Sequence, residues 1–194
     1  ITAAVQTNVK RMLAYSSIAH SGYLLIGVIT TGVSDNMSFG ASSVVFYLIG
    51  YSLMTLGAFA IVSLMEKDEN QSISIDGLAG YARKKPLMAL CLTILMLSMA
   101  GIPPTVGFFG KLYLFTAAIG EGLLWLAIWG VLNSVISVYY YLRPIVVMYM
   151  KDGDAEDAGP MFATRTAILI SSIFVVFLGL VSGPLFEVIE RALS

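Results

Sequence analysis

Five long runs of apolar residues limit the folds open to this chain more than any other feature. They cover residues 9–29, 41–65, 86–120, 123–150 and 162–185. The hydrocarbon core of a bilayer is about 30 Å thick and needs roughly 20 apolar residues in a helix. Of the 194 residues, 58% are apolar and 12% charged, which is more apolar and less charged than soluble domains are. The sequence therefore predicts an all-α membrane protein, a single transmembrane domain built as a bundle of about five transmembrane helices.

The run at 86–120 carries the segment GIPPTVGFFGK in its middle. Pro103 and Pro104 each remove a backbone donor and clash with the preceding turn of a helix, and the glycines of this segment add backbone freedom. We therefore expect one helix to be broken mid-membrane at Gly101–Gly110. The run then crosses the membrane either once, with an interruption, or twice, as two short spans.

The distribution of Lys and Arg favours one of these alternatives. Loops rich in Lys and Arg stay on the cytoplasmic side of a membrane. With one broken crossing, only Arg191 lies on the outer side, and nine basic residues share the other: Lys10, Arg11, Lys67, Arg83, Lys84, Lys85, Arg143, Lys151 and Arg165. With two crossings, the division is seven against three. We therefore expect a single broken crossing, a cytoplasmic start, cytoplasmic basic loops and an outward C-terminus.

Other features of the chain exclude several classes of function. A net charge of −1 provides no basic field for nucleic acid. The single cysteine, Cys91, lies in an apolar run and offers neither a disulfide framework nor a thiolate metal site. The chain begins at Ile1, without an initiator Met or a signal-peptide pattern, a few residues before a helix. We expect a C-terminal fragment of a longer protein that has further helices upstream.

Lys111 is the residue with the clearest chemical implication, because it lies inside the interrupted run just after the break. A lysine at membrane depth costs at least ~2.5 kcal/mol on insertion scales. One interpretation is that its side chain extends along the helix to reach the interface. The other is that it occupies a hydrated cavity beside the broken backbone, where irregular backbone is tolerated, and takes and releases a proton.

His20, the only histidine, lies within the first run in the segment AYSSIAHSGY. An imidazole ordinarily titrates near pH 6.5, which suits a proton relay, and a hydrogen-bonded packing role is equally open. The tyrosines of the fourth run, Tyr139, Tyr140 and Tyr141, are interpreted as interfacial anchors or packing residues.

Two long segments carry a family resemblance: QTNVKRMLAYSSIAHSGYLLIG (Gln6–Gly27) and LSMAGIPPTVGFFGKLYLF (Leu97–Phe115). They resemble the antiporter-like subunits of respiratory complex I, which are also shared by multisubunit cation/proton antiporters. The resemblance extends through the Tyr139–Met150 segment. The helix at Phe46–Met65 has tyrosines and no histidine, and a lysine follows GFFG. Both details resemble the N-type subunits of bacterial type I NADH-quinone oxidoreductase, the counterparts of mitochondrial subunit 2, rather than the L- or M-type.

The resemblance implies proton translocation across the bacterial inner (plasma) membrane, with Lys111 as the terminal proton carrier and His20 as a candidate relay. It implies a non-redox subunit of the enzyme, with no cofactor in this chain and with electron transfer from NADH to quinone in other subunits. The expected partners are other membrane subunits of the respiratory complex, the lipid bilayer and protons. Two alternatives remain: a subunit of a multisubunit sodium/proton antiporter, or a membrane anchor in which the lysine only packs.

Overall fold

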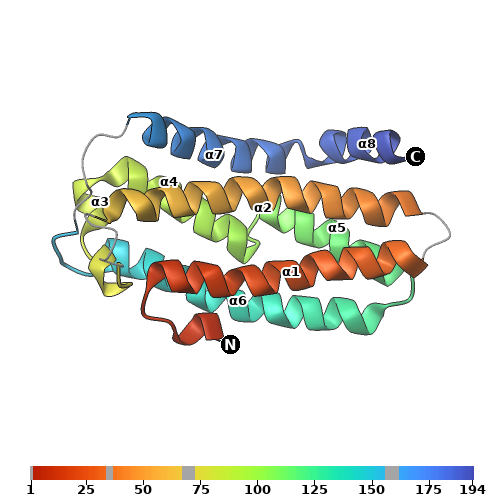
Figure 1. The fold of residues 1–194 in the computed structure, drawn as a ribbon, viewed down its shortest axis with the longest axis horizontal. Helices are drawn as coiled ribbons and strands as arrows, with labels where there is room; N and C mark the ends of the chain where they lie inside the picture. The colour runs from red at the N-terminus through yellow and green to blue at the C-terminus, as the bar shows by residue number, and fades with distance from the viewer. Residues whose placement is uncertain (1, 34–36, 67–72, 156–161) are drawn as a thin grey trace.

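The computed structural model describes residues 2–33, 37–66, 73–155 and 162–194, which form a bundle of helices. The elements are η1 (Thr2–Val5), α1 (Val9–Val33), α2 (Met37–Met65), η2 (Asp76–Leu78), α3 (Tyr81–Lys84), α4 (Pro86–Ala100), α5 (Val106–Gly120), α6 (Leu124–Met150), α7 (Phe162–Leu180) and α8 (Ser182–Leu193). Figure 1 shows the long helices running side by side along the longest axis of the molecule. The prediction of an all-α bundle is confirmed.

The third crossing is made by two short helices in succession. By length and composition, α1, α2, α6 and α7 are each able to cross a membrane, whereas α4 and α5 have 15 residues each. In Figure 1, α4 begins at the end of the bundle where α1 starts, and α5 continues to the opposite end. The two helices together therefore span the length of the bundle once, as expected of one broken crossing, beside the four long helices of the described residues.

The interruption is shorter than the sequence suggested. The helical path is left only between Gly101 and Thr105, and α5 begins at Val106, so Gly107 and Gly110 lie inside a helix. Their role is close packing rather than backbone freedom. A Cβ atom on Gly107 would collide with the carbonyl oxygen of Ser98, and one on Gly110 would lie 2.7 Å from the ring of Tyr47.

The last apolar run also differs from its expected span of 162–185. Helix α7 ends at Leu180, and α8 starts at Ser182 after a single intervening residue. Pro184 explains this end, because it has no N–H to donate to the carbonyl of Leu180. Phe186 of α8 is buried, with its ring centroid 4.2 Å from that of Tyr113 and 5.0 Å from that of Phe39.

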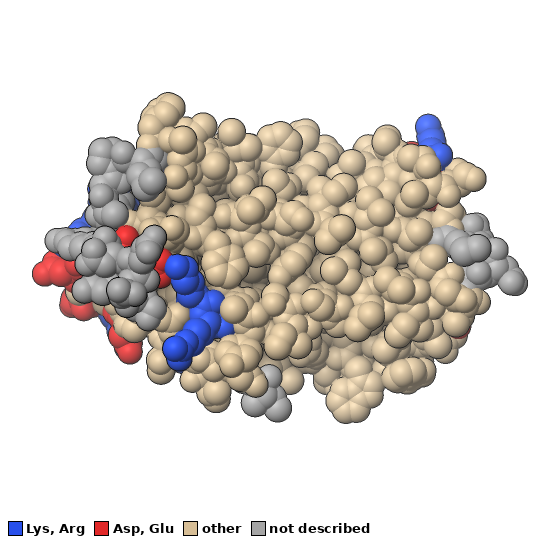
Figure 2. All heavy atoms as spheres, in the orientation of Figure 1, with Lys and Arg blue, Asp and Glu red and all other residues tan. Residues whose placement is uncertain are grey.

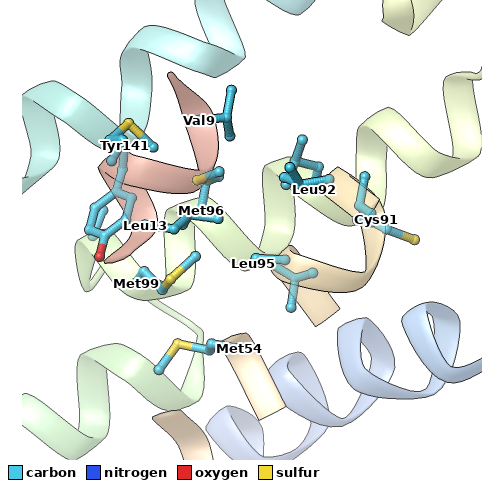
Figure 3. Packing of buried hydrophobic residues seen from close by; sticks show 14 of the residues in the cluster. Val9, Leu13, Met54, Cys91, Leu92, Leu95, Met96, Met99 and Tyr141 are labelled. Carbon is cyan, nitrogen blue, oxygen red and sulfur yellow. The ribbon is translucent and has the colours of Figure 1, made fainter. Parts of the chain in front are cut away.

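The apolar core lies around α4, which other helices of the bundle surround. Figure 3 shows Leu92, Leu95, Met96 and Met99 of α4 beside residues of α1, α2 and α6. Cys91 is buried in the same cluster, as expected of a small apolar residue. This packing buries the last residues of α4, Met99 and Ala100, whereas Pro103 and Pro104 of the break are exposed on the surface of the bundle.

Charged side chains gather at the end of the bundle where α1 starts, and most of the length between the two ends is uncharged on the face shown in Figure 2. Lys10 pairs with Glu66 at 2.5 Å, and Lys151 pairs with Asp76 at 2.8 Å. Arg83 and Asp152 form a further pair. Of the nine basic residues assigned to this side, Lys67 lies outside the described residues. An uncharged girdle between charged ends is the pattern of a helix bundle in a bilayer.

Candidate functional site: a lysine at the broken helix

The break in the third crossing leaves two carbonyl groups without a helical donor. In a continuous α-helix, the carbonyls of Met99 and Ala100 would accept the N–H groups of residues 103 and 104. Both of these residues are prolines and have no N–H. The two preceding carbonyls are capped, because the amide of Gly101 bonds to Leu97 and Ser98 at 3.1 and 2.9 Å, and that of Ile102 bonds to Leu97 at 3.0 Å.

Glycine is required at this cap. Gly101 has a φ of 86°, in the left-handed region that residues with a Cβ atom rarely adopt. A Cβ atom here would also lie 3.1 Å from both Cδ and Nζ of Lys111. The turn therefore ends α4 and at the same time leaves room for the lysine.

The Lys111 ammonium group occupies the end of α4. Its Nζ donates to the carbonyls of Met99 at 3.0 Å and Ala100 at 3.1 Å, and to Oγ of Ser134 on α6 at 2.9 Å. These three acceptors match the three N–H groups of an ammonium ion. The C-terminal end of a helix carries partial negative charge, which favours a cation there. Lys111 is 4% exposed, so the interpretation that it extends to the interface is wrong.

Tyr23 of α1 lies against the lysine. Its ring centroid is 5.0 Å from Nζ of Lys111, within the range of a cation–π interaction. The Tyr23 hydroxyl accepts a hydrogen bond of 3.2 Å from Nδ2 of Asn133 on α6. Residues of α1, α5 and α6 therefore converge on one polar site within the apolar bundle.

His20 is held by two tyrosine hydroxyls in a buried position one turn from Tyr23 on α1. Nδ1 lies 2.6 Å from Oη of Tyr47, and Nε2 lies 2.8 Å from Oη of Tyr141. The ring stacks on that of Tyr51, with centroids 4.5 Å apart. A neutral imidazole donates from one nitrogen and accepts at the other, so this chain of groups can reverse its direction by exchanging tautomers.

The two site residues predicted from the sequence, Lys111 and His20, lie in one interior region without a direct bond among the described contacts. Tyr23 lies beside both, with its ring centroid 5.9 Å from that of His20. Sequence reasoning missed Ser134 and the role of Tyr141, which was interpreted as an anchor or packing residue. A signal was present, because polar residues recur at helical spacing on one stripe of an otherwise apolar segment: Asn133, Ser134, Ser137 and Tyr141.

The chain has a helix that is interrupted within the bundle, and a buried lysine bonds to the last carbonyls before the interruption. These features place it in the class of all-helical membrane proteins that have a titratable side chain in the interior. The comparisons with known proteins identify the family. Residues 1–137 match the model of the NADH:quinone oxidoreductase/Mrp antiporter transmembrane family. The chain belongs to this family.

Within the family, the chain is similar to bacterial proteins named NADH-quinone oxidoreductase subunit N. It is 63% identical over 192 residues to that of Bdellovibrio bacteriovorus, covering 98% of this chain and 40% of the relative. It is 50% identical over 155 residues to that of Trichlorobacter lovleyi, covering 80% of this chain and 31% of the relative. The chain thus spans less than half the length of these relatives.

Solved structures have the same fold. A chain of respiratory complex I from Thermus thermophilus matches with a TM-score of 0.82 and 32% identity, over 96% of this chain and 41% of that one. A chain of the Mrp complex from Dietzia sp. matches with a TM-score of 0.83 and 20% identity, over 98% of this chain and 43% of that one. The second likeness concerns the fold alone. The identities therefore favour the oxidoreductase branch of the family over the antiporter branch.

Proposed function

We propose that this chain is part of a proton-translocating, non-redox membrane subunit of a NADH-quinone oxidoreductase. Lys111 takes and releases the translocated proton, and His20 acts as a relay. Electron transfer and its cofactors belong to other subunits of the complex, which are this chain's partners in the membrane. The observation that carries the proposal is the set of three acceptors around the Lys111 ammonium group at the end of α4. The similarity to subunit N relatives supports it.

The geometry links the protonation of the lysine to the shape of the break. A charged Lys111 has three N–H groups for three acceptors, whereas a neutral amine has two N–H groups and a lone pair. When the proton leaves, one of the three acceptors loses its donor and the attraction between the charge and the helix end disappears. A hydrogen bond to a charged group contributes about 1.5–3 kcal/mol. A change of this size links the shape of the break to the protonation of Lys111. Neighbouring subunits that move the break can therefore drive proton release, and proton release can in turn move the break and act on those subunits.

Replacement of Lys111 tests the proposal. Lys111→Ala removes the proton carrier and keeps a residue that suits a helix, so the complex should assemble and lose most of its proton pumping per NADH oxidised. Lys111→Arg keeps the charge but does not release a proton near neutral pH, because the pKa of a guanidinium exceeds ~12, and it should also be impaired. Lys84→Ala, which removes a lysine from the charged end of the bundle, is the matched control and should pump normally.

The measurement is proton pumping per NADH oxidised, in membranes with equal content of the complex. Normal pumping by Lys111→Ala would refute the proton-carrying role and leave the packing role. Normal pumping by Lys111→Arg would show that Lys111 is needed only as a fixed positive charge and does not release a proton. Pumping that depends on sodium rather than on the proton would instead support the antiporter alternative.

We also propose that the charged end of the bundle faces the cytoplasm of a bacterial cell and that α8 ends on the outer side. The distribution of Lys and Arg supports this orientation. Single cysteines introduced as Lys84→Cys and Ser194→Cys test it with an impermeant thiol reagent in intact cells. We expect labelling at 194 alone. The native Cys91 is buried and should add little background. Labelling at 84 without labelling at 194 would reverse the assignment.

A further inference from the structure

The three partners of the Lys111 ammonium group differ in what they can do after the proton leaves. The carbonyls of Met99 and Ala100 can only accept hydrogen bonds. Neither can supply a proton to a neutral amine or carry one away. The Ser134 hydroxyl, 2.9 Å from Nζ, can accept a hydrogen bond from an ammonium group and can equally donate one to an amine. Among the contacts that the structure describes around Nζ, it is the single group with both capacities.

The other side of Ser134 leads toward an open cavity whose wall is largely apolar and includes a few polar side chains. Ser134 and Tyr23 both contact the Lys111 ammonium group, the first through a hydrogen bond and the second through its ring, 5.0 Å from Nζ, and the Tyr23 hydroxyl accepts the bond from Asn133. Asn133 lines a cavity of about 250 Å³ between α1 and α6, together with Tyr140 and Gly22. Gly22 has open space where a Cβ atom would lie. A cavity of this size with polar groups in its wall has room for several water molecules.

Ser134 itself is placed by the packing of α6 against the broken crossing. Gly130, one turn earlier on α6, has no side chain to separate this helix from Phe115 of α5 and Ile26 of α1, and a Cβ atom there would lie 2.5 Å from the Phe115 ring. The backbone carbonyl of Ser134 accepts a hydrogen bond of 2.6 Å from Ser137. The hydroxyl is thereby brought within reach of a lysine that belongs to a different helix.

We propose that Ser134 passes the proton to and from Lys111. In release, one N–H proton of the ammonium group moves to Oγ of Ser134, while the hydroxyl proton of Ser134 moves to Oη of Tyr23. The hydroxyl proton of Tyr23 moves in turn to a water molecule at the Asn133 side of the cavity. Lys111 ends as a neutral amine, both hydroxyls are restored, and the water becomes hydronium. Uptake runs through the same groups in reverse. This inference rests on the proposed function, because it assigns the route by which Lys111 exchanges its proton.

A pair of substitutions with the same shape tests the route. Ser134→Thr keeps a hydroxyl, whereas Ser134→Val puts a methyl group in its place and leaves no room for a water molecule there. Both side chains are branched at Cβ and have similar helix preferences, so a purely steric effect would affect both alike. Ser172→Ala is the control for the loss of a buried serine, because Ser172 bonds to the carbonyl of Ile168 in its own helix at 2.9 Å.

The assay is proton pumping per NADH oxidised by the assembled complex, with Lys111→Ala measured beside the serine variants. We expect Ser134→Thr and Ser172→Ala to retain most pumping and Ser134→Val to lose most of it. Equal pumping by the Thr and Val variants, at any level, would overturn the route. If Lys111→Ala loses pumping in the same series, the proposed function stands without the Ser134 route. If Lys111→Ala pumps normally, the proposed function itself is wrong.

Discussion

Gly101 and Gly122 both have left-handed backbones, with φ of 86° and 74°, but they differ in their surroundings. A Cβ atom on Gly101 would lie 3.1 Å from Cδ and Nζ of Lys111, whereas one on Gly122 would meet nothing within 4 Å. Replacing either by Ala forces a residue with a Cβ atom into the left-handed region, at a cost of roughly 1–2 kcal/mol. For a chain of this size, each kcal/mol lowers the thermal midpoint by about 2–4 °C. We therefore expect both variants to unfold about 2–8 °C below the parent.

Only Gly101→Ala should also affect pumping. The new methyl group is too close to the lysine chain, which must move by a few tenths of an ångström. The bonds of 3.0 and 3.1 Å from Nζ to Met99 and Ala100 would then exceed the usual hydrogen-bond range. The assays are thermal unfolding in detergent and pumping in membranes. Equal pumping by Gly101→Ala and Gly122→Ala would refute the close coupling between the helix cap and the lysine. An unchanged thermal midpoint in both variants would refute the strain.

Two further predictions concern the histidine and the charged end. Tyr141→Phe removes the hydroxyl beside Nε2 of His20 and leaves that nitrogen without its partner, which should lower the unfolding free energy by about 1–3 kcal/mol. The measurement is denaturant unfolding, with Tyr139→Phe, on the exposed side of α6, as the control. A loss of unfolding free energy no larger than that of the control would contradict the prediction. The hydrogen bond and charge of Lys151 lower the pKa of the exposed Asp76 carboxyl, so their ion pair is fully formed above the ordinary carboxyl pKa and is lost as the pH falls through the lowered pKa. Carboxyl NMR titration should show this lowered midpoint and its return toward the ordinary value in Lys151→Met; an unchanged midpoint would exclude the pairing.

The crossings and the break followed from local features of the sequence. An apolar run long enough for a bilayer, a pair of prolines and a lysine just beyond them are all visible within the segment 86–120. The partners of the site were not visible, because they depend on how distant helices pack. Ser134 is 23 residues from Lys111 in the chain, and Tyr141 is 121 residues from His20. No local pattern fixes which faces of α1, α5 and α6 meet.

The end of the last crossing was missed for a different reason. Pro184 stands in an otherwise apolar segment, and the hydropathy of a run does not report a missing N–H group. The same chemistry was recognised at Pro103 and Pro104, where two prolines and several glycines stand together. A single proline near the end of a run is a weaker sign, since helices also tolerate proline in their first turn. In α8 it stands in that first turn.

Two of the three acceptors that hold Lys111 are main-chain carbonyls, so a scan of side-chain substitutions does not detect them directly. No side-chain substitution at Met99 or Ala100 can delete a carbonyl, so the chemistry of the site does not fix the side chains there, and only their packing in the core limits them. The site is instead specified by Pro103 and Pro104, because neither has an N–H group to bond to these carbonyls. A residue with an N–H at either position could compete with the ammonium group for its carbonyl. The side chains that supply no atom to the site, those of the two prolines, therefore determine whether the two carbonyls are left to bind the ammonium group.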